Sequence, residues 1–377
     1  MSCIAVCESS IVVAKGLVVD VYDYSSHNYI HALVSSQSFD KDHIIDIAIS
    51  NNSKHLAFIT SASKKLLVYT LPLTNDEVHK TYQLPRSASR IRFTTNDEQI
   101  LVADKSGDVL IFNIKEKDGG SKLLGHLSLL LDVLQTGNGK HIITCDRDEK
   151  IRVSCYPNTY NIESFCLGHS EFVNHIEMLP HNSNLLTSTS GDGTIRVWDY
   201  IKGQLIYCID TFLDINDEEL RLKFCKLMEE DGVEVNALPI VHYTVTQLNE
   251  SSSLCAVYVH SYNAILFYHL QSTDNETNYL LVEKLTLDYV PAAFKFYKLC
   301  FYIYNDINCN IKIYNILRKP DNIHLQFANQ IDLVELSNKI KETKNNFEII
   351  KVLYKRKFDN VQEYQERKKQ RLEKNSK

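Results

Sequence analysis

Apolar and polar residues alternate along this chain in many short runs that are separated by polar turns. Runs of this length and period predict β-strands, because successive side chains of a strand face opposite sides of its sheet. The clearest unit spans residues 168–199, GHSEFVNHIEMLPHNSNLLTSTSGDGTIRVWD. It contains two strand-forming runs, at residues 184–188 and 194–198, joined by a tight Gly-Asp-Gly turn. The chain is therefore expected to consist mainly of strands and hairpins.

The last strand of this unit recurs at nearly regular intervals. A repeat of roughly 40 to 45 residues that opens with Gly-His and closes with Trp-Asp is the signature of a four-stranded WD40 blade. The one interval of 70 residues, between Val197 and Phe267, then corresponds to a blade plus an insertion. The sequence predicts an all-β fold, a seven-bladed WD40 β-propeller with a basic C-terminal helical tail. The residues that mark the repeat are Val21, Val68, Ile111, Val153, Val197, Phe267 and Ile313, in steps of 47, 43, 42, 44, 70 and 46 residues.

Four polar residues of the 168–199 unit are expected to form a buried relay. Asp192 can accept hydrogen bonds from its own turn and from His169. His169 can then reach Ser188, and Ser188 can accept from the indole N–H of Trp198. Such a relay is tolerated inside a blade because every polar member has a partner.

The repeat divides the chain into two parts. Residues 1–340 are expected to form the propeller, with an acidic, helix-leaning insertion at about 211–232. Residues 341–377 lose the strand alternation and are expected to form a basic tail, helical or partly disordered. Residues 343–377 carry eleven Lys or Arg against five Asp or Glu, so the net charge of -6 conceals an acidic remainder. The basic runs of this tail are Lys355, Arg356, Lys357, Arg367, Lys368 and Lys369.

Composition indicates an ordinary globular protein, with 44% hydrophobic and 23% charged residues. Ten cysteines without a C-x-x-C pair favour free thiols in a reducing compartment. No run approaches the roughly 20 apolar residues of a membrane span, and the N-terminus lacks the basic region of a signal peptide. We expect the protein in the nucleus and, secondarily, in the cytoplasm.

Catalytic motifs are missing from the sequence. It contains no G-x-S-x-G, no H-E-x-x-H and no dinucleotide-binding glycine pattern, and the GNGK run at 137–140 lacks the spacing of a phosphate loop. His169 and His175 are more readily explained by the blade relay and by a strand than by a metal site. We therefore expect no catalytic residue, no metal and no cofactor bound by this chain.

The turn DRDEKIR at 146–152 places six charges within seven residues. A solvated loop explains this turn, with Asp148 in the ordinary turn role. A calcium site at Asp146 and Asp148 is disfavoured by the basic residues between and beside them. The alternative is a docking surface, because Lys150 and Arg152 alternate on a strand and point the same way, toward carboxylates of another protein.

The turn at 146–152 belongs to the fourth repeat unit. Comparison of that unit with the 168–199 unit predicts which residues share a role. Asp148 matches Asp192, and Thr144 matches Ser188. Ser154 stands where the tryptophan is found, so the relay of the fourth blade is expected to be incomplete.

The runs ADKSGDV, LLGHLSLLLDV, ITCDRDEKIRVS, IESFCLGHSEFV and SGDGTIRVWDY, followed by KRKFDNVQEY, resemble the WD-repeat, non-catalytic subunit of the tRNA (guanine-N7-)-methyltransferase. The resemblance implies a scaffold that binds a separate Rossmann-type methyltransferase. That partner holds S-adenosylmethionine, and the pair methylates a variable-loop guanine in tRNA. The implied partner-binding residues are Lys150 and Arg152, with Asp146, Arg147 and Glu149 as neighbours and Lys105 on the adjoining blade.

Other functions stay open at this point. A generic WD40 adaptor, such as a chromatin or ubiquitin-ligase substrate receptor, would dock through the acidic insertion. Hydrolysis by the propeller itself would need a titratable cluster in its central channel. The basic tail is compatible with contact to tRNA phosphates, with nuclear import, or with no specific role.

Overall fold

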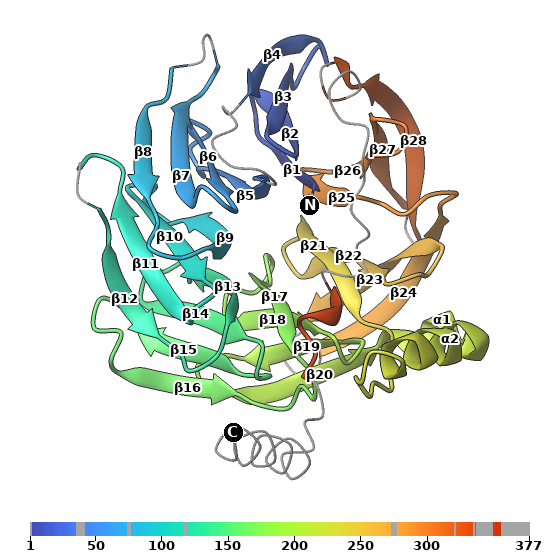
Figure 1. The fold of residues 1–377 in the computed structure, drawn as a ribbon. Helices are drawn as coiled ribbons and strands as arrows, with labels where there is room; N and C mark the ends of the chain where they lie inside the picture. The colour runs from blue at the N-terminus through green and yellow to red at the C-terminus, as the bar shows by residue number, and fades with distance from the viewer. Residues whose placement is uncertain are drawn as a thin grey trace, which may run out of the picture.

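Seven four-stranded antiparallel sheets are arranged as blades around a central axis in the described part of the chain (Figure 1). The computed structural model describes residues 2–34, 42–73, 77–116, 119–272, 277–319, 322–334, 336 and 350–355. The prediction of an all-β, seven-bladed propeller is confirmed. No helix among these residues is long and apolar enough to cross a membrane.

Blades 1 to 4 follow one another in chain order, each from its inner to its outer strand. Blade 1 contains β1 (Ser2–Val6), β2 (Ser10–Lys15), β3 (Val18–Asp23) and β4 (Tyr29–Val34). Blade 2 contains β5 (Ile44–Ile49), β6 (His55–Thr60), β7 (Lys65–Thr70) and β8 (Lys80–Gln83). Blade 3 contains β9 (Ala88–Phe93), β10 (Gln99–Asp104), β11 (Asp108–Asn113) and β12 (Ser121–Gly125). Blade 4 contains β13 (Leu130–Gln135), β14 (His141–Asp146), β15 (Ile151–Cys155) and β16 (Ile162–Cys166).

The other three blades and the two helices complete the fold. Blade 5 contains β17 (Val173–Met178), β18 (Leu185–Ser190), β19 (Thr194–Asp199) and β20 (Gln204–Asp210). The helices α1 (Thr211–Ile215) and α2 (Glu218–Glu229) follow it. Blade 6 contains β21 (Ile240–Asn249), β22 (Ser252–Val259), β23 (Ala264–Ser272) and β24 (Thr277–Thr286), and blade 7 contains β25 (Ala293–Tyr297), β26 (Cys300–Asn305), β27 (Asn310–Lys319) and β28 (Asn322–Asp332).

All seven residues that mark the repeat lie in the third strand of their blade. Val153 and Val197, for example, lie in β15 and β19 and are fully or almost fully buried. The repeat is visible in the sequence because the third strand of each blade packs against neighbouring blades, as Val153 and Val197 do in core clusters shared between blades, and such positions must be apolar.

The ring closes without exchange of a strand among the described residues, because blade 1 and blade 7 are each built in sequence order. Apolar side chains of the two blades share one core cluster. The segment after β28 crosses to blade 1, where the Val334 N–H donates to the Tyr22 hydroxyl oxygen at 2.9 Å. Lys15 also forms an ion pair of 3.6 Å with Asp306. Packing and these few polar contacts therefore fasten the seam.

The acidic insertion forms α1 and α2 and is attached to the propeller. Asp217 caps α2 by accepting a hydrogen bond from the Leu220 N–H. Phe224 and Met228 are buried in the core shared by blades 5 and 6. Leu227 is 43% exposed, because the buried stripe of α2 runs through Phe224 and its i+4 neighbour Met228.

Candidate functional site

Blade 5 contains a complete polar relay. His169 Nδ1 lies 2.9 Å from Asp192 Oδ2, and His169 Nε2 lies 2.8 Å from Ser188 Oγ. The indole N–H of Trp198 donates to the same hydroxyl oxygen at 2.8 Å. Burial lowers the pKa of His169, so its imidazole is neutral near pH 7. Burial alone would raise the pKa of Asp192, but hydrogen bonds from His169 and Thr194 hold it below its ordinary value.

Blade 4 uses a different carboxylate for the same purpose. His126 Nδ1 lies 3.0 Å from Asp146 Oδ2, and its Nε2 lies 2.8 Å from Thr144 Oγ1. The prediction that Asp148 matches Asp192 is therefore wrong for the histidine contact. Asp146 ends β14, and its second oxygen accepts from the N–H groups of Asp148 and Lys150 at 2.9 and 3.0 Å. One buried carboxylate thus serves both the turn and the relay.

Arg152 is tied to its own blade and to blade 3. Its Nε donates to Ser154 Oγ at 2.9 Å, and Ser154 occupies the strand position that Trp198 has in blade 5. Its terminal nitrogens donate to the carbonyl oxygens of Gly125 at 3.1 Å and Thr159 at 2.9 Å. Partial burial lowers the pKa of Arg152. The expectation that this guanidinium points outward with Lys150 is not met, because three protein acceptors hold it.

The exposed charges of the blade-4 turn, residues 146–150, are fewer than the sequence indicates. Asp146 is 2% exposed and belongs to the relay. Arg147 is partly buried, whereas Lys150 is exposed. Lys105 is exposed in the corresponding turn of blade 3, between β10 and β11. We call the surface formed by the two turns the charged turn surface, and its exposed cations are Lys105 and Lys150.

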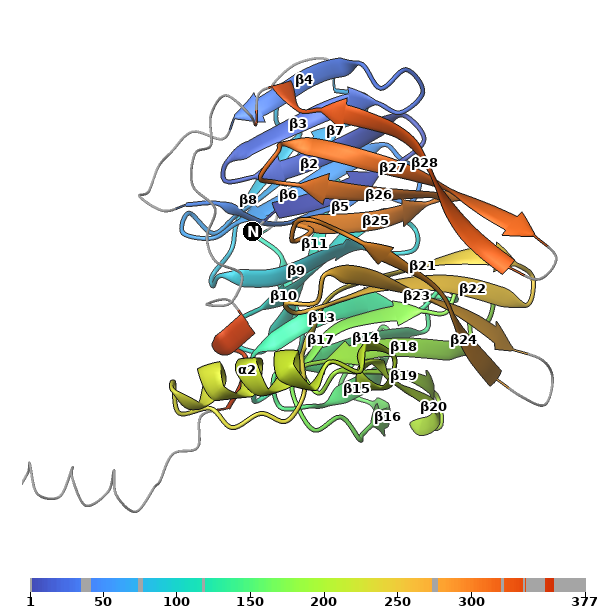
Figure 2. The ribbon, with the colours of Figure 1, turned by 90° about the vertical axis from the view of Figure 1, so that its right-hand side faces the viewer.

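Residues 350–355, which we call the tail anchor, pack beside this surface. Ile350 and Tyr354 are buried in the core of blades 5 and 6. The Tyr354 ring meets Phe172 edge-on, with ring centroids 4.9 Å apart. Lys351 forms an ion pair with Asp231 just after α2. Figure 2 shows this segment, in red, on the same side of the propeller as α2.

The last residue of the tail anchor reaches the blade-4 turn. Lys355 Nζ lies 2.6 Å from a Glu149 carboxylate oxygen and 3.7 Å from one of Asp148. This anchor was not predicted from the sequence, although apolar residues spaced three and four apart in EIIKVLY are a signal for a buried helical turn. The other basic residues named for the tail, Arg356, Lys357, Arg367, Lys368 and Lys369, lie outside the described residues.

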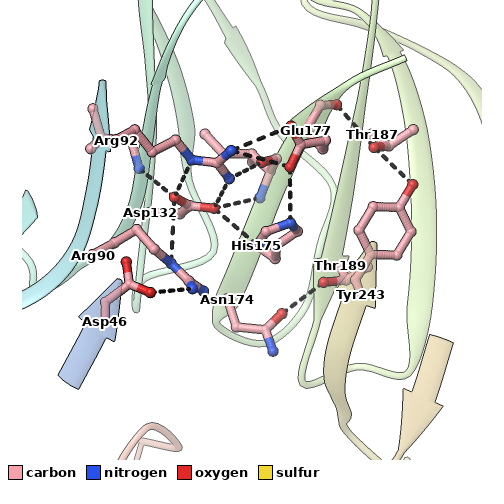
Figure 3. A network of polar contacts seen from close by, with 12 residues as sticks. Asp46, Arg90, Arg92, Asp132, Asn174, His175, Glu177, Thr187, Thr189 and Tyr243 are labelled. Atoms are coloured by element: carbon pink, nitrogen blue, oxygen red, sulfur yellow. Dashed lines mark hydrogen bonds and ion pairs between the residues drawn. The ribbon is translucent and has the colours of Figure 1, made fainter. Parts of the chain in front are cut away.

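A second candidate lies in the central channel, where a network of charges joins the inner strands of four blades (Figure 3). Arg92 Nη2 lies 2.8 Å from Asp132 Oδ2, and its Nη1 lies 3.1 Å from Glu177 Oε2. His175 Nδ1 lies 3.1 Å from the same oxygen of Asp132. Arg90 lies 3.4 Å from Asp46. All of these residues except Asp132 line part of a cavity of about 820 Å³.

The charges of the channel mainly neutralise one another. Burial opposes ionisation of Asp132, but the two neighbouring arginines, Arg92 and Arg90, hold its pKa well below its ordinary value. Arg92 and His175 likewise hold the pKa of Glu177 below its usual range despite burial. Neither carboxyl is therefore a proton donor near pH 7. The titratable cluster that hydrolysis would require is present, but its arrangement is that of a clamp between blades.

The sequence comparison identifies the family. The family model described as the tRNA methyltransferase TRM82 WD40 domain matches residues 24–122 and 113–295. The chain belongs to this family.

Individual relatives show how much of this chain is similar to proteins with this family's names. A Drosophila pseudoobscura pseudoobscura protein named tRNA (guanine-N(7)-)-methyltransferase non-catalytic subunit wuho is 32% identical over 344 residues, 88% of this chain and 78% of that protein. The Mus musculus protein named as the same subunit, WDR4, is 43% identical over 171 residues, 45% of this chain. The match spans only 40% of the length of the mouse protein.

Solved structures of other WD40 proteins have a fold similar to that of this chain. The structure titled as the WD40 repeats of RRP9 has a TM-score of 0.62 with 18% identity, and the match covers 80% of this chain and 86% of that one. At this identity the likeness shows the fold alone.

Proposed function

We propose that this chain is the non-catalytic subunit of a tRNA (guanine-N7-)-methyltransferase and that it binds the catalytic subunit through the charged turn surface. The observation that carries the proposal is the match, over 88% of the chain, to a relative with that name. In this proposal S-adenosylmethionine is bound by the catalytic partner, and the complex methylates a guanine in the variable loop of tRNA in the nucleus.

The structure supports one part of the surface more than another. Lys150 and Lys105 are exposed, so carboxylates of a partner can reach their ammonium groups. Arg152 is held by three acceptors of this chain, which makes it a structural link between blades 3 and 4 rather than a free contact. If this chain binds the active conformation of the partner more tightly than the inactive one, it shifts the partner toward the active conformation. The shift in free energy equals the difference between the two binding free energies.

The test is co-expression of this chain with the cognate catalytic subunit and measurement of complex affinity. Lys150→Glu is expected to weaken the complex at least tenfold, since charge reversal in a contact places like charges together. Lys140→Glu is the matched control, because Lys140 is an exposed lysine on the same blade, in the turn between β13 and β14 at the opposite end. Equal affinities of the two variants would remove the charged turn surface from the proposal.

The adaptor function has one observation in its favour. Leu213, Leu222 and Leu227 on the two helices are 73%, 58% and 43% exposed, so the insertion keeps an apolar surface. Mass spectrometry of proteins that co-purify with the tagged full-length chain separates the two functions. Co-purification of a methyltransferase subunit would support the proposal. Loss of 7-methylguanosine from tRNA when the chain is deleted would support it independently. A ligase or chromatin component in its place would contradict the proposal.

A further inference from the structure

A histidine, a cysteine and a glutamate meet at the end of blade 4 that lies opposite the blade-4 turn. His141 begins β14 and pairs directly with Cys155 at the end of β15. The register of β15 with β16 shifts between Val153 and Ser154, and the resulting bulge contains Glu163. A bulge redirects a side chain. The fold thereby brings three different metal-binding groups together from three neighbouring strands.

The distances from Glu163 to the other two groups are close to those between zinc ligands. One ligand atom from each residue lies within 4.8 Å of the other two. Cys155 Sγ lies 3.4 Å from Glu163 Oε2, and His141 Nε2 lies 3.8 Å from the same oxygen. Tetrahedral zinc with bonds of about 2.3 Å to sulfur and about 2.0–2.2 Å to nitrogen and oxygen separates its ligands by about 3.3–3.7 Å. The two measured distances are therefore close to two edges of that tetrahedron.

The imidazole of His141 is poorly satisfied by the described residues alone. Its side chain is 12% exposed, and Nδ1 is buried without a hydrogen-bond partner among them. The separation of 3.8 Å between Nε2 and Glu163 is too long for a hydrogen bond. A cation between Nε2 and Glu163 would use the Nε2 lone pair and the carboxylate charge at once, and the ring proton would then reside on Nδ1.

We propose that His141, Cys155 and Glu163 bind one Zn²⁺ ion, with water in the fourth position. A thiolate and an imidazole beside a carboxylate favour zinc over magnesium or calcium, which prefer oxygen ligands. The carboxylate of Glu163 is 37% exposed, so the ion can enter from solvent. Binding releases the thiol proton of Cys155 to solvent, and the ion fastens β14, β15 and β16 to one another. The site is independent of the partner surface.

The test uses the purified full-length chain after removal of metal with a chelator. Titration with Co²⁺ is expected to give one equivalent of binding, with the intense visible bands of a tetrahedral site and a thiolate-to-cobalt charge-transfer band, both lost when Zn²⁺ is added. Cys155→Ser should abolish the charge-transfer band. His141→Ala and Glu163→Gln should each weaken zinc binding at least tenfold. Cys208→Ser is the matched control, because Cys208 is an exposed free cysteine on blade 5.

Two further measurements distinguish loss of metal binding from misfolding of a variant. Far-UV circular dichroism of each metal-free variant should equal that of the metal-free wild type. Added Zn²⁺ should raise the melting temperature of the wild type and of Cys208→Ser but not of Cys155→Ser. An adventitious ion only, seen as weak binding that the three substitutions leave unchanged, would overturn the proposal, and so would a charge-transfer band that persists in Cys155→Ser.

Discussion

The hydroxyl of Tyr354 donates a hydrogen bond of 2.9 Å to the carbonyl oxygen of Gly191, across 163 positions of sequence. This contact attaches the tail anchor to the turn between β18 and β19 of blade 5. One residue later Lys355 contacts Glu149 in the blade-4 turn. A segment that follows the last blade in sequence is therefore part of the face on which blades 4 and 5 present their turns.

Replacing Tyr354 should destabilise the propeller in two separable steps. Tyr354→Phe removes only the hydrogen bond and should cost about 1 kcal/mol of unfolding free energy. Tyr354→Ala also leaves a cavity beside Phe172 and should cost about 3–5 kcal/mol. Urea denaturation measures both values. Tyr160→Ala is the control, because Tyr160 is 78% exposed and should change stability by less than about 0.5 kcal/mol. Equal losses for the buried and exposed tyrosines would show that the tail anchor is not packed.

Glu171, beside the tail anchor, should make stability fall as the pH rises. Burial, with Glu149 and Asp192 nearby, raises the pKa of Glu171 to about 7, whereas Lys355 lowers it. A carboxyl whose folded pKa exceeds its unfolded value of about 4.5 stabilises the fold below pH 4.5, and this contribution is lost as the pH rises through about 7. Between pH 6 and pH 8, ionisation of Glu171 should lower the free energy of unfolding of the wild type by about 1 kcal/mol.

The measurement compares urea denaturation of the wild type and of Glu171→Gln at pH 6 and pH 8. The amide cannot ionise, so the variant should lack this loss, and its stability relative to the wild type should be higher at pH 8 than at pH 6. Lys355→Met should shift the transition of Glu171 to higher pH, since it removes the cation that lowers the pKa. A pH dependence that is identical in wild type and Glu171→Gln would assign the effect to other groups.

The predictability of each part of this molecule depends on how far its contacts extend. The relay of His169, Ser188, Asp192 and Trp198 could be predicted because all four residues belong to one repeat with fixed spacing. The choice between Asp146 and Asp148 could not, since both belong to the same turn and only the turn geometry determines which of them contacts the histidine. The blade count followed from the period of the third strand.

Contacts between blades were beyond the reach of sequence patterns. Asp46, Arg92, Asp132 and Glu177 come from four different inner strands, and only closure of the ring determines which of them meet. The anchor at Tyr354 likewise depends on where the chain returns after blade 7. The cluster at His141 depends on a bulge in β16, which no spacing rule indicates.

The channel network should behave as a coupled unit rather than as separate ion pairs. Asp132 is fully buried, and Arg92 is 21% exposed. Asp132→Asn leaves Arg90 and Arg92 without their shared counter-charge, and Arg92→Met leaves Glu177 with a weaker partner. Each substitution should cost about 3–5 kcal/mol, because the remaining buried charges are then only partly compensated. Urea denaturation of both single variants and the double variant gives the coupling energy.

The double variant should be less destabilised than the sum of the single variants, with a coupling energy of about 1–3 kcal/mol. Lys115 and Glu98 provide the matched control, since this pair is as close, at 2.7 Å, but its side chains are 74% and 51% exposed. Solvent screens such a pair, and its coupling should stay below about 1 kcal/mol. If the buried and exposed pairs gave the same coupling energy, the channel charges would not act as a clamp between blades.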